Sequence, residues 1–291
     1  MEINRGLDLS RPDDMTDAEV RQFRASYESS HGSVLDAYDF WLDYSPRVVK
    51  SHRIQAYYSA SDEGRAVPLH GTLGFLHLYT VMAYDFGIAY EVKHARSLGA
   101  TRRAVLQVFE LAFIHCGPRG IHRARLAAGE LLADWPDTDS DMSASFPPGW
   151  SPDPRFLDLD LDLTSGQLTP QEEASIRDWY TRLAGEVPGH VDFLAAGRPG
   201  LLKAYLDRLG RAMRGPLPRQ IFPFVQLQLD VARGNPAGIR ESALLGRGLG
   251  LTDDQLYEAA AWGMLYGGPA SLSLARDVLS DVLPTTRTTA R

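Results

Sequence analysis

The chain has 291 residues, of which 44% are hydrophobic and 23% charged, and its net charge is −7. This composition excludes a wholly disordered chain, and without any Lys/Arg-rich block it gives no support for nucleic acid or an anionic membrane as a partner. The sequence has no run of about 18 apolar residues, so no membrane span is predicted. The polar N-terminus lacks the apolar core of a secretory signal. With one cysteine, Cys116, the chain cannot form an internal disulfide, and we expect a cytoplasmic protein.

Helix signals dominate the first half of the chain. Thr16 and Glu19 form a capping box that predicts a helix to about Tyr27. Gly117 and Pro118 are typical of a helix end, so a helix that starts at residue 101 should end near residue 115. The other helices predicted in this half cover residues 34–44, 48–59, 73–98 and 121–134.

A Pro-, Asp- and Ser-rich segment, residues 135–168, interrupts the helical pattern and predicts a linker between two domains, 1–134 and 169–291. Within it, leucine and aspartate alternate from Leu157 to Leu163. We expect an extended arm with its leucines on the protein body. Calcium binding by the three aspartates is disfavoured, because an extended strand lacks the turning loop of a calcium site.

Helical patterning resumes at Thr169, where a second capping box with Glu172 is followed by proline in the first turn. Strand signals are few, so the sequence predicts an all-α fold. The later predicted helices cover residues 199–214, 219–232, 237–247, 252–266 and 271–283.

One stretch of the chain recurs 151 residues later without gaps. Residues 98–125 read LGATRRAVLQVFELAFIHCGPRGIHRAR, and residues 249–276 read LGLTDDQLYEAAAWGMLYGGPASLSLAR. The Gly-x-Thr cap and the Gly-Pro break fall on the same positions in both. A fixed offset over this length indicates two copies of one structural unit.

The repeated pattern resembles the carboxymuconolactone decarboxylase family, which includes the AhpD-like alkylhydroperoxidases. The phrases HARSLGATRRAVLQVFELAFIHCGP and LLGRGLGLTDDQLYEAAAWGMLYGGP carry the resemblance, over about residues 35–130 and 195–285. It implies an all-α fold with two tandem copies of the family unit. It also implies a homo-oligomer, a trimer or a smaller assembly such as a dimer.

The chain departs from this family at the redox motif, Cys-x-x-Cys-x-x-x-His. Counted back from Gly99, the three motif positions hold Tyr84, Gly87 and Glu91, so the first copy has no thiol there. Peroxide reduction by a dithiol needs two neighbouring sulfurs, so dithiol peroxidase activity is not expected. The same positions of the second copy hold Asn235, Gly238 and Ser242.

Histidines are concentrated in the first copy, which holds six of the eight between residues 52 and 122. We therefore expect the first copy to bear the active site and the second to be structural. The second copy has no histidine at the positions of His94, His115 and His122, where it has Leu245, Tyr266 and Ser273.

The strongest candidate pair is Glu91 and His94, because residues spaced i, i+3 are neighbours on a helix. A carboxylate beside an imidazole can orient it as a proton shuttle. On the same predicted stripe, Tyr84 is a candidate hydrogen-bond donor and Gly87 would leave room for a ligand. The alternative is an ordinary surface ion pair with Tyr84 at a packed rim.

Other histidines are weaker candidates. His70 and His77 share a helix face. The resemblance implies that His115 lies near the active cavity, as the residue at this position does in the family. Each is alternatively an ordinary core or surface histidine. Cys116 is not expected to be activated by its neighbour His115, because adjacent helical side chains point about 100° apart. No His-x-x-x-His or His-x-His spacing occurs, and neither a metal nor another cofactor is expected.

Together these features predict an acid–base enzyme, decarboxylase- or lyase-like, acting on a small organic acid, lactone or β-keto compound. The reaction class follows from the resemblance, with His94 or Glu91 as base and Tyr84 and His77 as donors. Two alternatives remain open: a hydrolase or cyclase in a biosynthetic pathway, and a catalytically silent ligand-binding or assembly protein. The expected substrate contacts are Gly87, His115 and His70.

Overall fold

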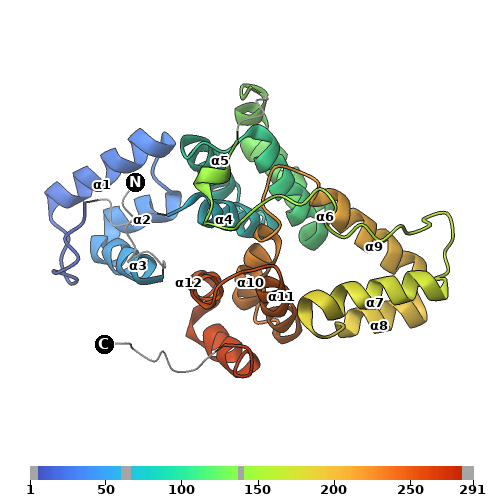
Figure 1. Ribbon diagram of the computed structural model, residues 1–291. Coiled ribbons are helices and arrows are strands. Elements are labelled where there is room, and N and C mark those ends of the chain that lie inside the picture. Colours follow the sequence, from blue (N-terminus) through green and yellow to red (C-terminus); the bar gives the residue numbers. More distant parts are fainter. Residues whose placement is uncertain (1–5, 60–66, 137–140, 284–291) are drawn as a thin grey trace. The chain divides into compact units, whose positions relative to one another are not determined.

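The computed structural model describes residues 6–59, 67–136 and 141–283, and its regular elements there are all helices, which confirms the all-α prediction. The chain divides into two compact units, residues 1–147 and 148–291. In Figure 1 the helices of unit 1 run from blue to green. They are α1 (Asp17–His31), α2 (Asp36–Tyr44), α3 (Pro46–Ser59), α4 (Leu69–Met82), α5 (Asp85–Ser97) and α6 (Arg102–Ala133), followed by a short 3-10 turn, η1 (Ser143–Ser145).

The described part of unit 2, residues 148–283, contains six α-helices, coloured yellow to red in Figure 1. The first three have the lengths of their counterparts in unit 1, which are 15, 9 and 14 residues. The packing also repeats, since α4, α5 and α6 contact one another and so do α10, α11 and α12. The helices are α7 (Pro170–Ala184), α8 (Gly189–Gly197), α9 (Pro199–Ala212), α10 (Ile221–Arg233), α11 (Pro236–Gly248) and α12 (Asp253–Val278).

The correspondence extends beyond the stretch that is visible in the sequence, to the first helix of each unit. The capping boxes at Thr16 and Thr169 are both confirmed. In each unit the glutamate of the box also binds a buried lysine from the third helix. Lys50 Nζ lies 2.8 Å from Glu19 Oε1, and Lys203 Nζ lies 2.7 Å from Glu172 Oε1. These pairs fix the first helix of each unit to the third.

The helix predicted over residues 73–98 is wrong, because two helices cover this range. Helix α4 ends at Met82, and Ala83 adopts the left-handed conformation with φ of 58°. Tyr84 is then extended and precedes the first turn of α5. The left-handed conformation costs an alanine about 1 kcal/mol or more. The sequence around residue 83 therefore does not predict a break there.

Both long helices, α6 and α12, bend at their Gly-Pro pairs. Gly117 has φ of 59° and Gly268 has φ of 73°, and each is followed by a proline inside the helical run. The sequence predicts a helix on either side of each Gly-Pro pair, and the structure shows these segments continuing across a kink. Glycine is suited to this position because it has no Cβ to oppose a positive φ.

The segment 135–168 contains the boundary between the units, which falls between Pro147 and Pro148. The leucine–aspartate alternation does not form an extended strand, because Leu157 and Asp160 have φ of 55° and 48°. Leu157 is buried as expected, but Leu163 is 47% exposed. Turns over residues 154–157 and 163–164 therefore flank the alternating segment, which forms no strand.

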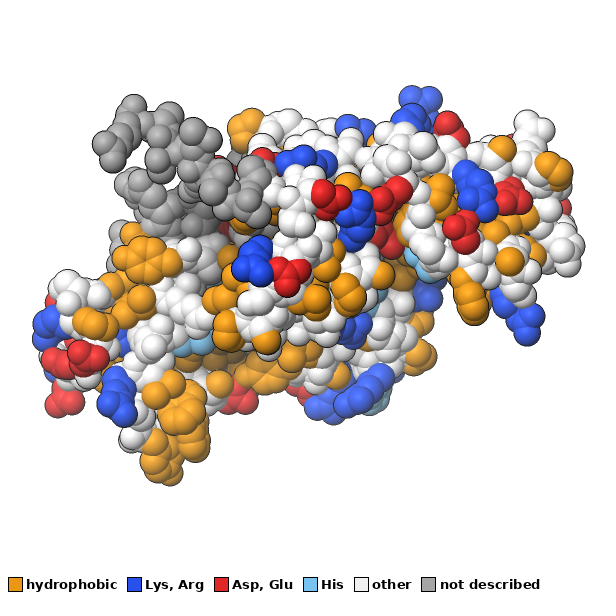
Figure 2. Space-filling model, turned by 90° about the horizontal axis from the view of Figure 1, so that it is seen from below, with side chains coloured by type: hydrophobic (Ala, Val, Ile, Leu, Met, Phe, Trp, Pro, Cys, Tyr) orange, Lys and Arg blue, Asp and Glu red, His pale blue; other side chains and the backbone are white. Residues whose placement is uncertain are grey.

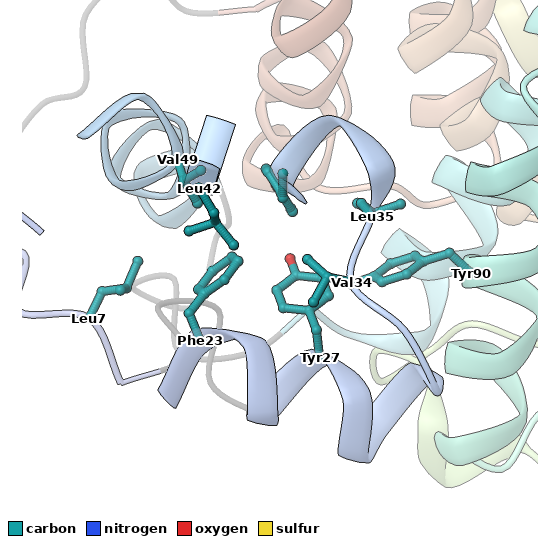
Figure 3. Packing of buried hydrophobic residues seen from close by; sticks show 9 residues of the cluster. Leu7, Phe23, Tyr27, Val34, Leu35, Leu42, Val49 and Tyr90 are labelled. Carbon is teal, nitrogen blue, oxygen red and sulfur yellow. The ribbon is translucent and has the colours of Figure 1, made fainter. Parts of the chain in front are cut away.

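A cluster of buried hydrophobic residues connects α1, α2 and α3 of unit 1 with α5. Phe23 and Tyr27 of α1 lie at its centre, and Tyr90 of α5 approaches Tyr27 with their ring centroids 5.5 Å apart (Figure 3). The cluster places α1 beside the helix that carries Glu91 and His94. Among the described residues, no helix combines the length and apolar character needed to cross a bilayer.

Candidate functional site

Glu91 and His94 lie side by side in α5 and are buried, at 4% and 5% exposure. His94 Nδ1 is 3.6 Å from Glu91 Oε2. This burial distinguishes the pair from an ordinary surface ion pair, whose charges are screened by water. In a buried setting the carboxylate and the imidazole interact more strongly.

A second contact to His94 comes from α4. Thr72 Oγ1 lies 3.2 Å from His94 Nδ1, within hydrogen-bond distance, and Thr72 is fully buried. Nδ1 therefore has two oxygen neighbours, one on its own helix and one on α4. This arrangement fixes the orientation of the ring and leaves Nε2 as the nitrogen that points away from both oxygens.

His31, at the end of α1, also contacts the ring of His94. The sequence patterns did not single out this residue. It is 1% exposed, and its ring lies flat on Tyr90 with centroids 3.9 Å apart and planes 5° apart. Its centroid is 4.6 Å from that of His94. No spacing rule could have found this residue, because the contact joins two helices that are distant in the sequence.

A row of polar side chains borders this aromatic cluster. Arg53 of α3 is buried and donates from Nη1 to the Tyr38 hydroxyl at 3.3 Å. The Tyr38 hydroxyl also lies 3.1 Å from His52 Nδ1. Burial, assisted by the charge of Arg53, lowers the pKa of His52 to about 4, so this imidazole is neutral at neutral pH.

His77 and His115 form a separate pair at the contact of α4 with α6. Their ring centroids lie 5.4 Å apart in an edge-to-face arrangement, and His77 is fully buried. Thr72 and His77 are five residues apart, about 140° around the axis of α4. His77 therefore lies on a different face of α4 from the residue that contacts His94. His70, which is also buried, shares the face of His77.

Burial is the property that most of these histidines share. On the face of the molecule drawn in Figure 2, only small areas of pale blue histidine are visible. The histidines of unit 1 with 5% exposure or less are His31, His70, His77 and His94.

Tyr84 does not occupy the expected helical stripe. It precedes α5, and its hydroxyl donates a hydrogen bond to Asp36 Oδ1. Burial and this bond raise the pKa of Tyr84. The hydroxyl of Tyr84 therefore has a partner within the protein, and its role as a donor to substrate stays a prediction.

The space beside Gly87 is filled by protein. A Cβ at this position would lie 2.5 Å from Tyr84 Cδ1 and 2.6 Å from Tyr79 Cδ2. The glycine allows two tyrosine rings to pack on α5, and with these rings in place no ligand fits directly against it. The expectation of a ligand at Gly87 is therefore corrected.

Cys116 lies just before the kink of α6 and is half-buried. Its sulfur is 3.5 Å from the carbonyl oxygen of Gly117, to which the thiol can donate. Within the described parts of the chain, no group of three or more His, Cys, Asp and Glu side chains has the arrangement of a metal site.

Unit 2 has a titratable group of its own at the corresponding place. Asp230 of α10 accepts hydrogen bonds from Asn235 Nδ2 at 2.9 Å and from Ser242 Oγ at 3.2 Å. Burial raises the pKa of Asp230 to about 6, although these two bonds oppose the shift. Asn235 and Ser242 are the residues aligned with Tyr84 and Glu91, so unit 2 is not uniformly apolar there.

No family model matches the chain, and no curated protein does. Among solved structures, the chain is similar to a protein of Burkholderia xenovorans LB400 described as a "putative gamma-carboxymuconolactone decarboxylase subunit". The two are 17% identical, the match covers 94% of this chain and 97% of that one, and the TM-score is 0.55. At this identity the likeness concerns the fold alone. The chain therefore has an all-helical, carboxymuconolactone decarboxylase-like fold.

Proposed function

We propose that the protein is an acid–base enzyme, decarboxylase- or lyase-like, which acts on a small organic acid, lactone or β-keto compound. The observation that carries the proposal is the buried contact of His94 with Glu91 and Thr72. The reaction class is taken from the fold and from the resemblance in sequence. The residue assignment rests on the geometry of α4 and α5.

In this proposal His94 is the base. Glu91 and Thr72 hold Nδ1, so Nε2 accepts a proton from the carbon next to a substrate carbonyl, or returns one to that carbon after CO₂ has left. The Glu91 carboxylate stabilises the imidazolium that forms. His31, in ring contact with His94, holds the imidazole in place from the side of α1.

The developing enolate needs a hydrogen-bond donor. We assign this role to His77 or His115 of the neighbouring helices α4 and α6, because an imidazole can donate from a ring N–H. His70 is proposed as a substrate contact on the same face of α4. Dithiol chemistry plays no part in the proposal, because one cysteine cannot form a disulfide within the chain.

The test is a turnover screen with β-keto acids and lactones, followed by CO₂ release and by mass spectrometry of the products. His94→Ala and Glu91→Gln are expected to lower kcat by about 100-fold or more. His190→Ala is the matched control, because His190 of unit 2 also contacts a glutamate, Glu241, at 3.4 Å. This variant should retain wild-type kcat.

The outcomes separate the three classes of function. Turnover with loss of CO₂ supports the decarboxylase proposal, whereas a hydrolysed or cyclised product of unchanged carbon count supports a hydrolase or cyclase. A ligand that binds without turnover supports a silent binding protein. Turnover that is unaffected in both His94→Ala and Glu91→Gln would remove the pair from the mechanism.

A further inference from the structure

The segment of residues 153–160 lines a polar pocket within unit 2. Side chains of α7 line the same pocket, together with Arg219 and Leu249, and its volume is about 420 Å³. This volume lies within the range of roughly 300 to 1,000 Å³ that is usual for sites that bind small molecules. We call it the α7 pocket. It contains neither Glu91 nor His94, which belong to unit 1.

Most of the charged side chains that line the α7 pocket already have an ion-pair partner. Three carboxylates of the lining each lie beside an arginine, so their charges are balanced within the protein. The pairs are Asp153 with Arg219 at 3.4 Å, Asp158 with Arg214 at 3.4 Å and Asp178 with Arg182 at 3.8 Å.

Arg155 and Asp160 are the two charged residues of this lining that form no ion pair with a described residue, and they are not paired with each other. Both are exposed. An unpaired charge is ordinary on a protein surface, but here two of opposite sign share one pocket. The α7 pocket thus offers one free positive and one free negative charge. A ligand that carries both a carboxylate and an ammonium group matches this pair.

Three further hydrogen-bond donors of the lining have no acceptor among the described residues. They are Arg219 Nε, which is a buried atom, the hydroxyl of Ser175 and the indole N–H of Trp179, a residue that is only 5% exposed. A buried donor without an acceptor costs about 1 to 3 kcal/mol. A ligand carboxylate has two acceptor oxygens, so its binding would supply what these donors lack.

An aromatic surface forms part of the same lining. The rings of Phe156 and Trp179 meet edge to face with their centroids 5.6 Å apart. Both residues are at most 5% exposed, so core packing fixes their positions. Aromatic rings present a large apolar area to a neighbouring group. The lining therefore favours a ligand with an apolar or aromatic part besides its two charges.

The segment that carries Arg155 and Asp160 is held in a defined shape. Asp153 Oδ1 accepts a hydrogen bond from the backbone N–H of Arg155 at 3.0 Å. Leu157 and Asp160 adopt the left-handed conformation, with φ of 55° and 48°. Such residues cost about 1 kcal/mol or more each, and they persist where the surrounding structure imposes them, which is frequent at ligand sites. The two free charges are therefore presented on a fixed backbone.

We propose that the α7 pocket binds a free amino acid with an aromatic or large apolar side chain. The guanidinium of Arg155 binds the carboxylate of the ligand, and the carboxylate of Asp160 binds its ammonium group. The side chain of the ligand lies against Phe156 and Trp179. A simple carboxylate or a simple amine would leave one of the two protein charges without a partner, so each should bind more weakly.

This site goes beyond the acid–base proposal, because it lies in unit 2 and shares no residue with the proposed catalytic set. Failure of either proposal therefore leaves the other unchanged. The site gives a ligand to the unit that the sequence predicts to be structural.

The first experiment uses isothermal titration calorimetry of the full chain at pH 7 with three related probes. L-phenylalanine carries both charges, 3-phenylpropanoate lacks the ammonium group, and 2-phenylethylamine lacks the carboxylate. L-phenylalanine is expected to bind at least about tenfold more tightly than either of the others. No binding of L-phenylalanine up to about 10 mM, or an analogue that binds as tightly, would overturn the proposal.

Two variants assign the charges. Arg155→Gln should weaken L-phenylalanine and 3-phenylpropanoate by about tenfold and leave 2-phenylethylamine unchanged. Asp160→Asn should weaken L-phenylalanine and 2-phenylethylamine instead, and asparagine tolerates the left-handed conformation. The matched controls are Arg125→Gln and Asp13→Asn, since both residues are exposed and have no ion pair with a described residue. Equal losses for both analogues in each variant would contradict the assignment.

The indole N–H of Trp179 reports where the ligand binds. The chain has five tryptophans, so nitrogen-labelled tryptophan gives five indole resonances in an NMR spectrum. The resonance of Trp179, assigned from its loss in Trp179→Phe, should shift most when L-phenylalanine is added. If Trp179→Phe does not fold, the same resonance is assigned from the spectrum of the folded wild type through its backbone. A largest shift at another tryptophan would place the ligand outside the α7 pocket and refute the proposal.

Discussion

His31 lies flat on Tyr90, with ring centroids 3.9 Å apart, and this stack joins the end of α1 to the helix that carries Glu91 and His94. Tyr27 extends the stack on the side of α1, at 5.5 Å from both rings. The position of His94 therefore depends on a helix that begins more than 70 residues earlier in the chain.

The first prediction concerns this stack. His31→Ala should lower the free energy of unfolding by about 3 kcal/mol, because it deletes a buried ring and leaves a cavity beside Tyr90. His31→Phe keeps a flat ring and should remain within about 1.5 kcal/mol of wild type, the usual scale of an aromatic pair. Urea unfolding followed by circular dichroism measures both. Equal losses in the two variants would show that the stack is not what stabilises this contact.

The second prediction concerns acid stability. Hydrogen bonds from Lys203 and from the backbone of Thr169 lower the pKa of Glu172 from 4.5 to about 2. A carboxyl whose pKa is lowered by folding stabilises the folded state above the unfolded pKa, and this stabilisation is lost as pH falls from about 4.5 to 2. The unfolding free energy of Glu172→Gln should therefore fall less steeply over this range than that of wild type.

The equivalent pair in unit 1 provides the comparison. Lys50 and the capping box lower the pKa of Glu19 to about 2 as well, although burial opposes this shift. Glu19→Gln should likewise reduce the loss of unfolding free energy as pH falls from about 4.5 to 2. The double variant should reduce this loss further. An acid limb that is identical in wild type and both variants would refute the assignment.

The third prediction has the opposite sign. The pKa of Asp230 is raised to about 6, so the folded state retains a proton that the unfolded chain loses near pH 4. Wild-type stability should therefore decline as pH rises from about 4 to 6, by at most about 3 kcal/mol. Asp230→Asn cannot ionise and should not show this decline. Denaturant unfolding at pH 4 and pH 7, followed by tryptophan fluorescence, tests the difference.

The helices that could be predicted well are those with local signals. The boxes at Thr16 and Thr169 mark helix starts correctly because a cap is a contact between residues three apart. The break at Ala83 could not be predicted, because alanine has no preference for the left-handed region that it adopts there. Helix α8 was missed because it is short and starts and ends with glycine.

The candidate site likewise combines a contact that the sequence could predict with contacts that it could not. The contact of Glu91 with His94 could be predicted, because it depends only on the i, i+3 spacing of one helix. Thr72 and His31 reach the site from α4 and α1, and no periodicity relates them to His94. Tyr84 does not share the predicted stripe, because the helix breaks at Ala83 and α5 begins after Tyr84. Tertiary packing therefore determines which side chains surround the imidazole.

The last prediction tests the close approach of α7 to α11. A Cβ on Gly248 would lie 1.8 Å from the carbonyl oxygen of Leu183, which is backbone and cannot move aside easily. Gly248→Ala should therefore lower the unfolding free energy by about 2 kcal/mol or more, the scale of overpacking in a core. Gly129→Ala in α6 is the control, since its new Cβ would be no closer than 3.9 Å to the nearest atom. That change should raise stability by about 0.5 to 1 kcal/mol, because alanine favours a helix over glycine. If both variants were stabilised, α7 and α11 would have to be farther apart than the structure places them.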